Sequence, residues 1–173
     1  SEEQVEELFK ALRQLDEDLT FLFTMPNADT DGRVIMQMIE NFVEEMAGRA
    51  FSSLSLGQRN YFSAMKHCAA VVGNSSSGLL EAPVLRVPTV NIGDRQKGRL
   101  MAESVISCEP DVTSISKALR IATSPEFKSN LEGVYSPYGE GGASDRIAEI
   151  LRKVDLNPSL LKKRFYDLPA AKC

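Results

Sequence analysis

The sequence predicts an α/β fold in which helices cover both faces of an open parallel sheet. Short apolar runs alternate with amphipathic segments along the 173 residues. The runs are continuous, which is typical of strands buried on both faces of a parallel sheet. The chain is long enough to bury a core as one domain. It opens on a helix, however, whereas a doubly wound domain usually opens on a central strand, so we expect the first strand to precede residue 1.

The first half of the chain predicts three helices and three strands. Val5, Leu8 and Leu12 recur at helical spacing and mark the first amphipathic helix. The same spacing gives expected helices at residues 2–15, 34–43 and 60–67. Apolar runs bounded by turn-forming residues give expected strands at residues 19–24, 50–54 and 69–72.

The second half continues the alternation after a polar loop at residues 73–78. Its buried apolar runs give expected strands at residues 88–92 and 104–107. Its periodic segments give expected helices at residues 78–85, 112–122, 124–131 and 144–154. Residues 157–173 have a mixed pattern.

Composition and charge exclude several classes of protein. The formal net charge of −4 argues against nucleic acid, which needs a basic surface. No apolar run is long enough to span a bilayer, and the acidic, amphipathic start is no secretory signal. Cys68, Cys108 and Cys173 are an odd and scattered set, which favours reduced thiols over a disulfide framework. We therefore expect a cytoplasmic protein that binds neither nucleic acid nor membrane.

The polar loop GNSSSG, residues 73–78, lies between an expected strand and an expected helix. The first N–H groups of a helix have no intrahelical partners, and the helix dipole adds positive potential there. Three hydroxyls at this point are typical of a site that binds an anion such as phosphate. The alternative is that the serines only cap the helix, although a cap needs one serine, not three.

Two enzyme motifs with similar spacing are excluded. The loop has the glycine spacing of a P-loop, but Leu79 and Leu80 stand where that motif has lysine and a hydroxyl residue. This excludes a nucleotide triphosphatase. The Gly-x-Ser-x-Gly elbow of hydrolases fails because Gly78 comes one residue too late. That fold also needs a histidine after the serine, and His67 precedes it.

Other polar residues follow expected strands, at the sheet edge where α/β proteins bind ligands. Glu81 either accepts hydrogen bonds from ribose hydroxyls or is placed in the first helical turn by the dipole alone. Arg95 can fork two hydrogen bonds onto phosphate, although charged loops are often only solvated surface. Asn27 is either a ligand contact or a cap of the following helix.

No metal or cofactor is expected. Residues 27–32 mimic the start of a calcium-binding loop, but Met38 stands at the twelfth position, where glutamate is needed. Residues 138–142 imitate half of a dinucleotide fingerprint without the strand that must precede it. His67 and Cys68 have no companions at metal-ligand spacing and are expected to be structural.

Two segments are specific enough to indicate a family: VGNSSSGLLEAP at residues 72–83 and PTVNIGDRQKGR at residues 88–99. They closely resemble the hydrolysing UDP-N-acetylglucosamine 2-epimerases. PNADTDGR at residues 26–33 and SPYGEGGASDRIAEIL at residues 136–151 extend the resemblance over most of residues 1–165. Non-hydrolysing relatives carry TDSGG-x-QEE in place of GNSSSGLLEA, which favours the hydrolysing branch.

The resemblance implies the GT-B architecture, in which the active site lies between two Rossmann-like domains. This chain would be the carboxyl-terminal half: a UDP-binding domain at residues 1–155, without its first strand, and a tail at residues 156–173. Its partners would be UDP-N-acetylglucosamine or UDP and the missing N-terminal domain. Because dimers are common in the family, we expect a homodimer.

The resemblance also implies a set of binding residues. Ser75 and Ser76 would hold the diphosphate, Glu81 would bind the ribose hydroxyls, and Leu56 would contact uracil through its backbone. Arg33 matches a basic position near the cleft and receives no role. The implied UDP-binding positions are Ser75, Ser76, Glu81, Arg95, Asn27 and Leu56.

The implied reaction converts UDP-N-acetylglucosamine to N-acetylmannosamine and UDP, as in sialic-acid-type pathways. A base removes the proton at C2 while UDP leaves, and water then adds to the unsaturated sugar with inverted configuration. The family's acid–base carboxylates and a histidine would lie outside this sequence, so the chain carries no catalytic residue. Its share would be stabilisation of the departing diphosphate. Alone, it should bind UDP weakly and lack turnover.

Two alternatives stay open. A GT-B glycosyltransferase would use a similar nucleotide site but retain the configuration at C2. A regulatory domain that senses a nucleotide sugar would need no catalysis.

Overall fold

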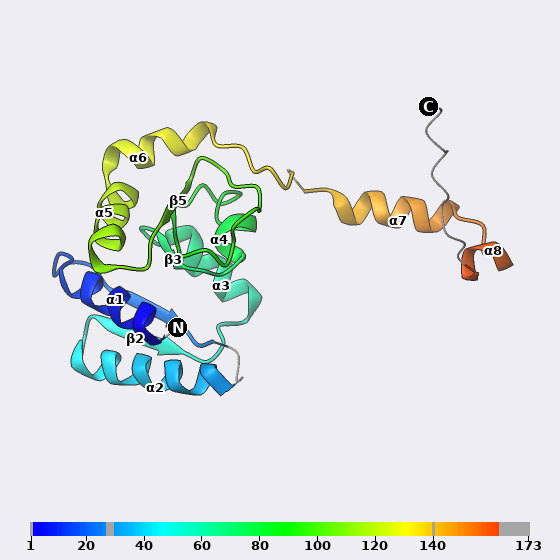
Figure 1. Cartoon of the computed structure of the whole chain (residues 1–173). Helices are drawn as coiled ribbons and strands as arrows, with labels where there is room; N and C mark the ends of the chain where they lie inside the picture. Colours follow the sequence, from blue (N-terminus) through cyan, green and yellow to red (C-terminus); the bar gives the residue numbers. More distant parts are fainter. Residues whose placement is uncertain (1, 27–29, 140, 163–173) are drawn as a thin grey trace, which may run out of the picture. The chain divides into compact units, whose positions relative to one another are not determined.

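The computed structural model describes residues 2–26, 30–139 and 141–162. It divides into two compact units, Ser1–Gly139 and Glu140–Cys173. The strands all belong to the first unit, and the second contains α7 (Ala143–Lys153) and α8 (Pro158–Leu161) (Figure 1). The predicted boundary at residue 155 stays a prediction.

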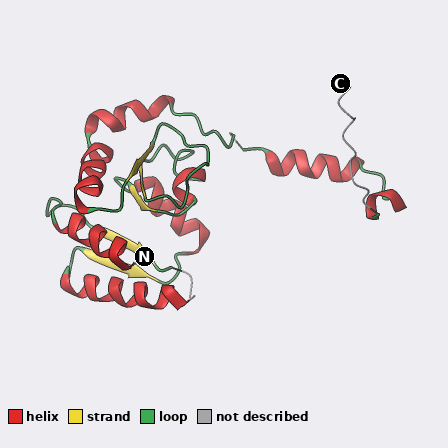
Figure 2. Ribbon diagram, in the orientation of Figure 1, coloured by secondary structure: helices red, strands yellow, loops and turns green. Residues whose placement is uncertain are grey.

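Within the described residues, five strands form two parallel sheets, drawn in yellow in Figure 2. They are β1 (Phe21–Thr24), β2 (Ala50–Ser53), β3 (Val71–Gly73), β4 (Thr89–Ile92) and β5 (Val105–Cys108). β1 pairs with β2, and the other three pair in the order β3-β4-β5. A doubly wound sheet has the strand order 3-2-1-4-5-6. In that order β1 and β2 correspond to strands 2 and 3, and β3, β4 and β5 correspond to strands 4, 5 and 6. Strand 1 of that order lies between strands 2 and 4. The parallel α/β class is confirmed, and the break between the two sheets falls where that order has its first strand.

Helices cover both faces of the β3-β4-β5 sheet. On one face α5 (Val112–Thr123) covers β4 and β5, and α1 (Glu2–Arg13) packs against α5. α1 also packs against α2 (Thr30–Glu45), which lies on β2 of the other sheet. The other face carries α3 (Gly57–His67) and α4 (Ser77–Leu80). Alternate residues of β3 show this division, because side chains of a strand point to opposite faces. Val72 joins the main core, and Val71 joins a smaller cluster with Met65 of α3.

Aromatic rings join the β1-β2 sheet to the main core. Phe9 and Phe42 stack with ring centroids 4.3 Å apart, and Phe23 meets both rings edge-on. Such pairs add to the free energy of burying the rings. The outer face of this sheet is less covered: Leu22 and Phe51, which are register partners, are each about half exposed. Only β4 is buried along its whole length, so the prediction of strands buried on both faces holds for β4 alone.

One predicted helix is much shorter than expected. The segment predicted as a helix at residues 78–85 is helical only to Leu80 and continues as turns. Pro83 lacks an N–H, and the residue before a proline is disfavoured in helical conformation. The last elements of the first unit are α6 (Pro125–Ser129) and a 3₁₀ turn (Asn130–Gly133). No helix among the described residues is long and apolar enough to cross a membrane.

Candidate functional site

Two loops lie side by side at the carboxyl edge of the β3-β4-β5 sheet. Residues 73–78, here called the serine loop, run from the last residue of β3 into the start of α4. Residues 93–98, here called the Arg95 loop, follow β4. Because β3 and β4 are neighbouring parallel strands, their carboxyl ends meet at one edge. The expectation that these segments share one region is therefore confirmed.

The two loops are joined at Asn74. Arg95 Nη1 lies 3.4 Å from Asn74 Oδ1, and Gln96 Nε2 donates a 2.7 Å hydrogen bond to the Asn74 backbone carbonyl. The Gln96 side chain is buried, although its neighbours Asp94 and Lys97 are exposed. Sequence reasoning predicted Arg95 but missed Asn74 and Gln96. The signal that could have pointed to them is that each motif contains one uncharged amide residue, Asn74 in GNSSSG and Gln96 in GDRQKGR.

The three serine hydroxyls have different surroundings. Ser75 Oγ accepts from the Ser77 N–H at 3.3 Å, and Ser77 Oγ accepts from the Tyr61 hydroxyl at 2.7 Å. Ser76 stands at the N-cap of α4, and its side chain makes no capping hydrogen bond. The capping alternative therefore accounts for Ser75 and leaves Ser76 without a role in the helix. Because α4 is a single turn, its dipole adds little to anion binding.

Glu81 does not lie where the sequence predicted. It is the C-cap of α4, not a residue of its first turn, so the helix dipole does not favour its carboxylate there. The side chain is half-buried, and Oε2 is buried with no hydrogen-bond partner among the described residues. A buried acceptor without a partner is costly. The structure therefore argues against the reading in which the helix dipole places Glu81. It is compatible with the reading in which Glu81 accepts hydrogen bonds from a ligand, because Oε2 has no donor among the described residues.

The remaining predicted residues lie on other elements. Leu56 precedes α3 as its N-cap, on the helix that brings Tyr61 to Ser77. Arg33 lies on α2, and its side chain is exposed. Asn27 lies outside the described residues, as does Cys173.

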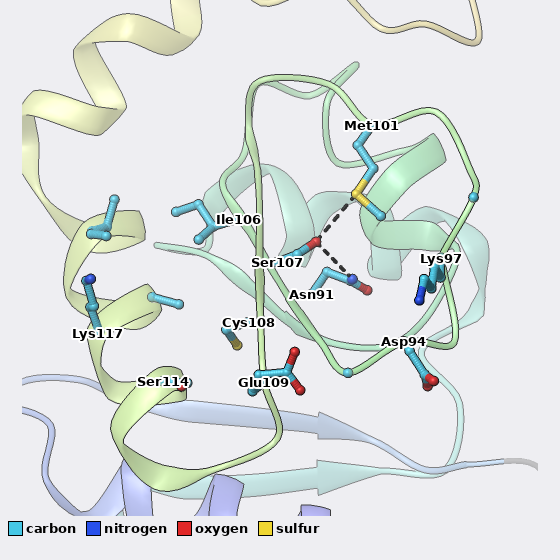
Figure 3. Close-up of a pocket in the computed structure, with 14 residues that line it drawn as sticks. Asn91, Asp94, Lys97, Met101, Ile106, Ser107, Cys108, Glu109, Ser114 and Lys117 are labelled. Atoms are coloured by element: carbon cyan, nitrogen blue, oxygen red, sulfur yellow. Dashed lines mark hydrogen bonds between the residues drawn. The ribbon is translucent and has the colours of Figure 1, made fainter.

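A cavity of about 700 Å³ adjoins the Arg95 loop, and no residue of the serine loop lines it. Figure 3 shows Asp94 and Lys97 on one side and Ser114 and Lys117 of α5 on the other, with β5 between them. None of Ser75, Ser76, Glu81 or Arg95 lines it. Acidic and basic side chains both line the cavity. Burial raises the pKa of the Cys108 thiol to about 11, and the nearby Asp111 and Glu109 raise it by smaller amounts. The cavity is therefore separate from the Ser75 and Ser76 hydroxyls and the Arg95 guanidinium, although Ser107 and Ser114 line it.

The strand order and the paired loops define a class of protein. This is a doubly wound α/β domain with polar loops at the carboxyl edge of its sheet, the place where such domains bind ligands. Within the described residues, no three or more His, Cys, Asp or Glu side chains gather in a way that could hold a metal ion.

Comparison with known proteins identifies the family. The family model for UDP-N-acetylglucosamine 2-epimerase matches residues 1–152, so the chain belongs to this family. It is 36% identical over 169 residues to a GDP/UDP-N,N'-diacetylbacillosamine 2-epimerase (hydrolyzing) of Campylobacter jejuni, covering 97% of this chain and 43% of that protein. It is 32% identical over 167 residues to polysialic acid biosynthesis protein P7 of Escherichia coli, covering 96% and 42%.

Solved structures agree on the fold. The UDP-GlcNAc 2-epimerase of Methanocaldococcus jannaschii, in complex with UDP-GlcNAc and UDP, superposes with a TM-score of 0.68 at 15% identity, covering 88% of this chain and 41% of that one. The Neisseria meningitidis enzyme bound to UDP-GlcNAc gives 0.62 at 16% identity, covering 88% and 41%. The chain thus has the fold of the carboxyl-terminal half of a GT-B epimerase and spans about two fifths of the length of its relatives.

Proposed function

We propose that this chain is the UDP-binding part of a hydrolysing UDP-N-acetylglucosamine 2-epimerase. The observation that carries the proposal is the junction at Asn74, where Arg95 and Gln96 tie the Arg95 loop to the serine loop. A guanidinium and two serine hydroxyls are thereby held at one sheet edge. Guanidinium and hydroxyl groups are suited to a diphosphate because both donate hydrogen bonds to anionic oxygens.

Each predicted UDP-binding residue that the structure describes receives a role in this proposal. Ser75 and Ser76 donate to the diphosphate, and Arg95 meets the negative charge that grows as the diphosphate leaves. Glu81 accepts from the ribose hydroxyls, which would satisfy its buried Oε2. The Leu56 backbone contacts uracil. Asn27 belongs to the same proposed set, although it lies outside the described residues.

The proposed reaction proceeds by elimination and hydration. A base removes the proton at C2 of the sugar, the electron pair forms the C1–C2 double bond, and the bond from C1 to the UDP oxygen breaks. Water then adds to the unsaturated sugar with inversion at C2, giving N-acetylmannosamine and UDP. The residues of this chain lower the barrier to departure of UDP, because they stabilise charge that is larger in the transition state than in the substrate.

The proton-transfer groups are proposed to lie on a second domain of the complete protein. The proposal is supported by relatives more than twice the length of this chain and by a strand order in which one further strand would join the two sheets. We further propose that the complete protein is a cytoplasmic homodimer, and that this chain alone binds UDP without turnover. A diacetamido sugar is the alternative substrate, favoured by the name of the Campylobacter relative.

Calorimetry and a product assay test these statements separately. UDP should bind the chain, and Ser75→Ala with Ser76→Ala should weaken binding at least tenfold, whereas Ser63→Ala, an exposed serine of α3, should not. The complete protein, given UDP-N-acetylglucosamine or its diacetamido counterpart, should release UDP and the 2-epimeric free sugar. Transfer of the sugar to an acceptor would instead identify a glycosyltransferase, and binding without any product a sensor.

A further inference from the structure

Gln96 is a buried amide in a loop of exposed charges. Its side chain is 3% exposed, whereas Asp94, Arg95 and Lys97 beside it are exposed. Its Nε2 donates to the backbone carbonyl of Asn74 at 2.7 Å, while Oε1 is buried with no partner among the described residues. A buried acceptor without a partner destabilises the fold, so we looked for what the hydrogen bond from Gln96 Nε2 stabilises. That hydrogen bond holds Asn74, the second residue of the serine loop.

Tyr61 holds the other end of the same loop. Its hydroxyl donates to Ser77 Oγ at 2.7 Å, and its ring packs with Met65 and Ala82 in the smaller core cluster. The ring is thus anchored on α3, and the hydroxyl is aimed at the loop. This bond engages the third serine hydroxyl, which is the one that the proposed function does not assign to the ligand.

The two bonds leave Ser75 and Ser76 between fixed ends. Asn74 is held on one side and Ser77 on the other, by side chains from two different elements. A loop ordered before binding loses less conformational freedom when the ligand arrives, so more of the contact energy appears as affinity.

We propose that Gln96 and Tyr61 are positioning residues for nucleoside diphosphate binding. They fix the two ends of the serine loop so that Ser75 and Ser76 face the phosphates, and neither touches the ligand itself. This inference rests on the proposed function, because it concerns the same site.

The test uses the complete protein, UDP as the probe, and calorimetry. Gln96→Met keeps the length and burial of the side chain but removes its donor, and Tyr61→Phe removes only the hydroxyl. Each should weaken UDP binding about tenfold, or about 1.4 kcal/mol. Because both act through the serines, neither should weaken it further in a background of Ser75→Ala with Ser76→Ala. A loss from general destabilisation would instead add to that of the serine substitutions.

Gln96→Glu supplies a second readout. A carboxylate cannot donate to the Asn74 carbonyl, whereas a protonated carboxyl can, and burial raises the pKa of such a group. The UDP affinity of this variant, taken as a ratio to that of the unchanged protein at each pH, should therefore rise as the pH is lowered from about 8 to about 5. Because protonation of the UDP phosphates affects both proteins alike, the ratio removes its effect on the measured affinity.

Tyr138→Phe is the matched control. It removes a hydroxyl that donates to the Leu100 carbonyl at 3.0 Å, away from the serine loop, and should leave UDP affinity within about twofold. If the unchanged protein does not bind UDP, the proposed function fails. If it binds, but Gln96→Met and Tyr61→Phe bind equally well or show losses that add to those of the serines, the positioning role alone is overturned.

Discussion

Thr89 of β4 and Gly78 of the serine loop are in direct contact. Thr89 Oγ1 donates to the Gly78 carbonyl at 2.9 Å, and a Cβ placed on Gly78 would lie 2.6 Å from Thr89 Cγ2. Thr89 is 2% exposed, so the methyl group has little room to move. Only glycine fits at the end of this loop, because β4 lies directly beneath it.

Gly78→Ala is therefore expected to destabilise the protein by about 1–3 kcal/mol, the usual cost of overpacking a core. Thr89→Ser removes the methyl group and keeps the hydroxyl, so in combination with Gly78→Ala it should restore part of the loss. Urea unfolding of both single variants and the double variant measures this coupling. Gly133→Ala, where a Cβ meets nothing within 4 Å, is the control. Strict additivity of the two changes would contradict the contact.

Glu81→Gln should weaken the binding of UDP about tenfold, because the amide nitrogen that replaces one carboxylate oxygen cannot accept a hydrogen bond from a ribose hydroxyl. Inorganic pyrophosphate, which has no ribose, should bind the variant and the unchanged protein alike. Competition calorimetry with both compounds makes the comparison. An equal loss for pyrophosphate would place Glu81 at the phosphates or in the loop's structure instead.

Arg95→Ala should weaken UDP binding about tenfold, and Arg95→Lys should recover only part of it, because lysine keeps the charge but not the planar fork. Lys97→Ala removes an exposed cation two residues further on and serves as the control for charge alone. Affinities at low and high salt separate the two effects, since the general charge effect is screened. Equal losses for Arg95→Ala and Lys97→Ala would argue that the loop acts only through its net charge.

Stability should decline in acid at the start of α5. The Ser114 N–H donates to Asp111 Oδ1 at 2.9 Å and lowers the pKa of Asp111 below 3.8. Lys10, and then the Val112 N–H, lower the pKa of Glu7 below 4.5. Because both native pKa values are depressed, their contribution is complete above the ordinary carboxyl range and is lost as the pH falls through the native values.

Urea midpoints measured at successive pH values below about 5 test this expectation. The double variant Glu7→Gln with Asp111→Asn should show a shallower decline than the unchanged protein. Glu126→Gln, an exposed carboxylate at the start of α6, is the control. An equally steep decline in the double variant would show that other carboxylates cause the loss of stability at low pH.

Much of the fold and part of the site could be predicted from local sequence. Short runs placed the strands within a few residues because each contains β-branched or aromatic residues, which favour strands. The extent of burial did not follow from these runs, since β4 alone among the described strands is buried throughout. The serine and Arg95 loops were predicted to converge because parallel strands end at one edge. The length of α4 was missed because Pro83 acts locally against the apolar pattern of residues 79–85. Gln96 and Tyr61 were missed as site residues because their hydrogen bonds to Asn74 and Ser77 join segments far apart in the chain.

The sequence by itself determined the α/β class and the family, and it predicted the residues proposed to bind a diphosphate, since each depends on residue type and spacing along the chain. Tertiary structure alone decided which of the three adjacent serine hydroxyls accepts from Tyr61, that Glu81 Oε2 is an acceptor without a donor among the described residues, and that Asn74 joins two loops. The physical reason is that a hydrogen bond depends on distance and direction between groups far apart in the chain. Asn74 and Gln96 are separated by 22 residues, and only the pairing of β3 with β4 brings them together.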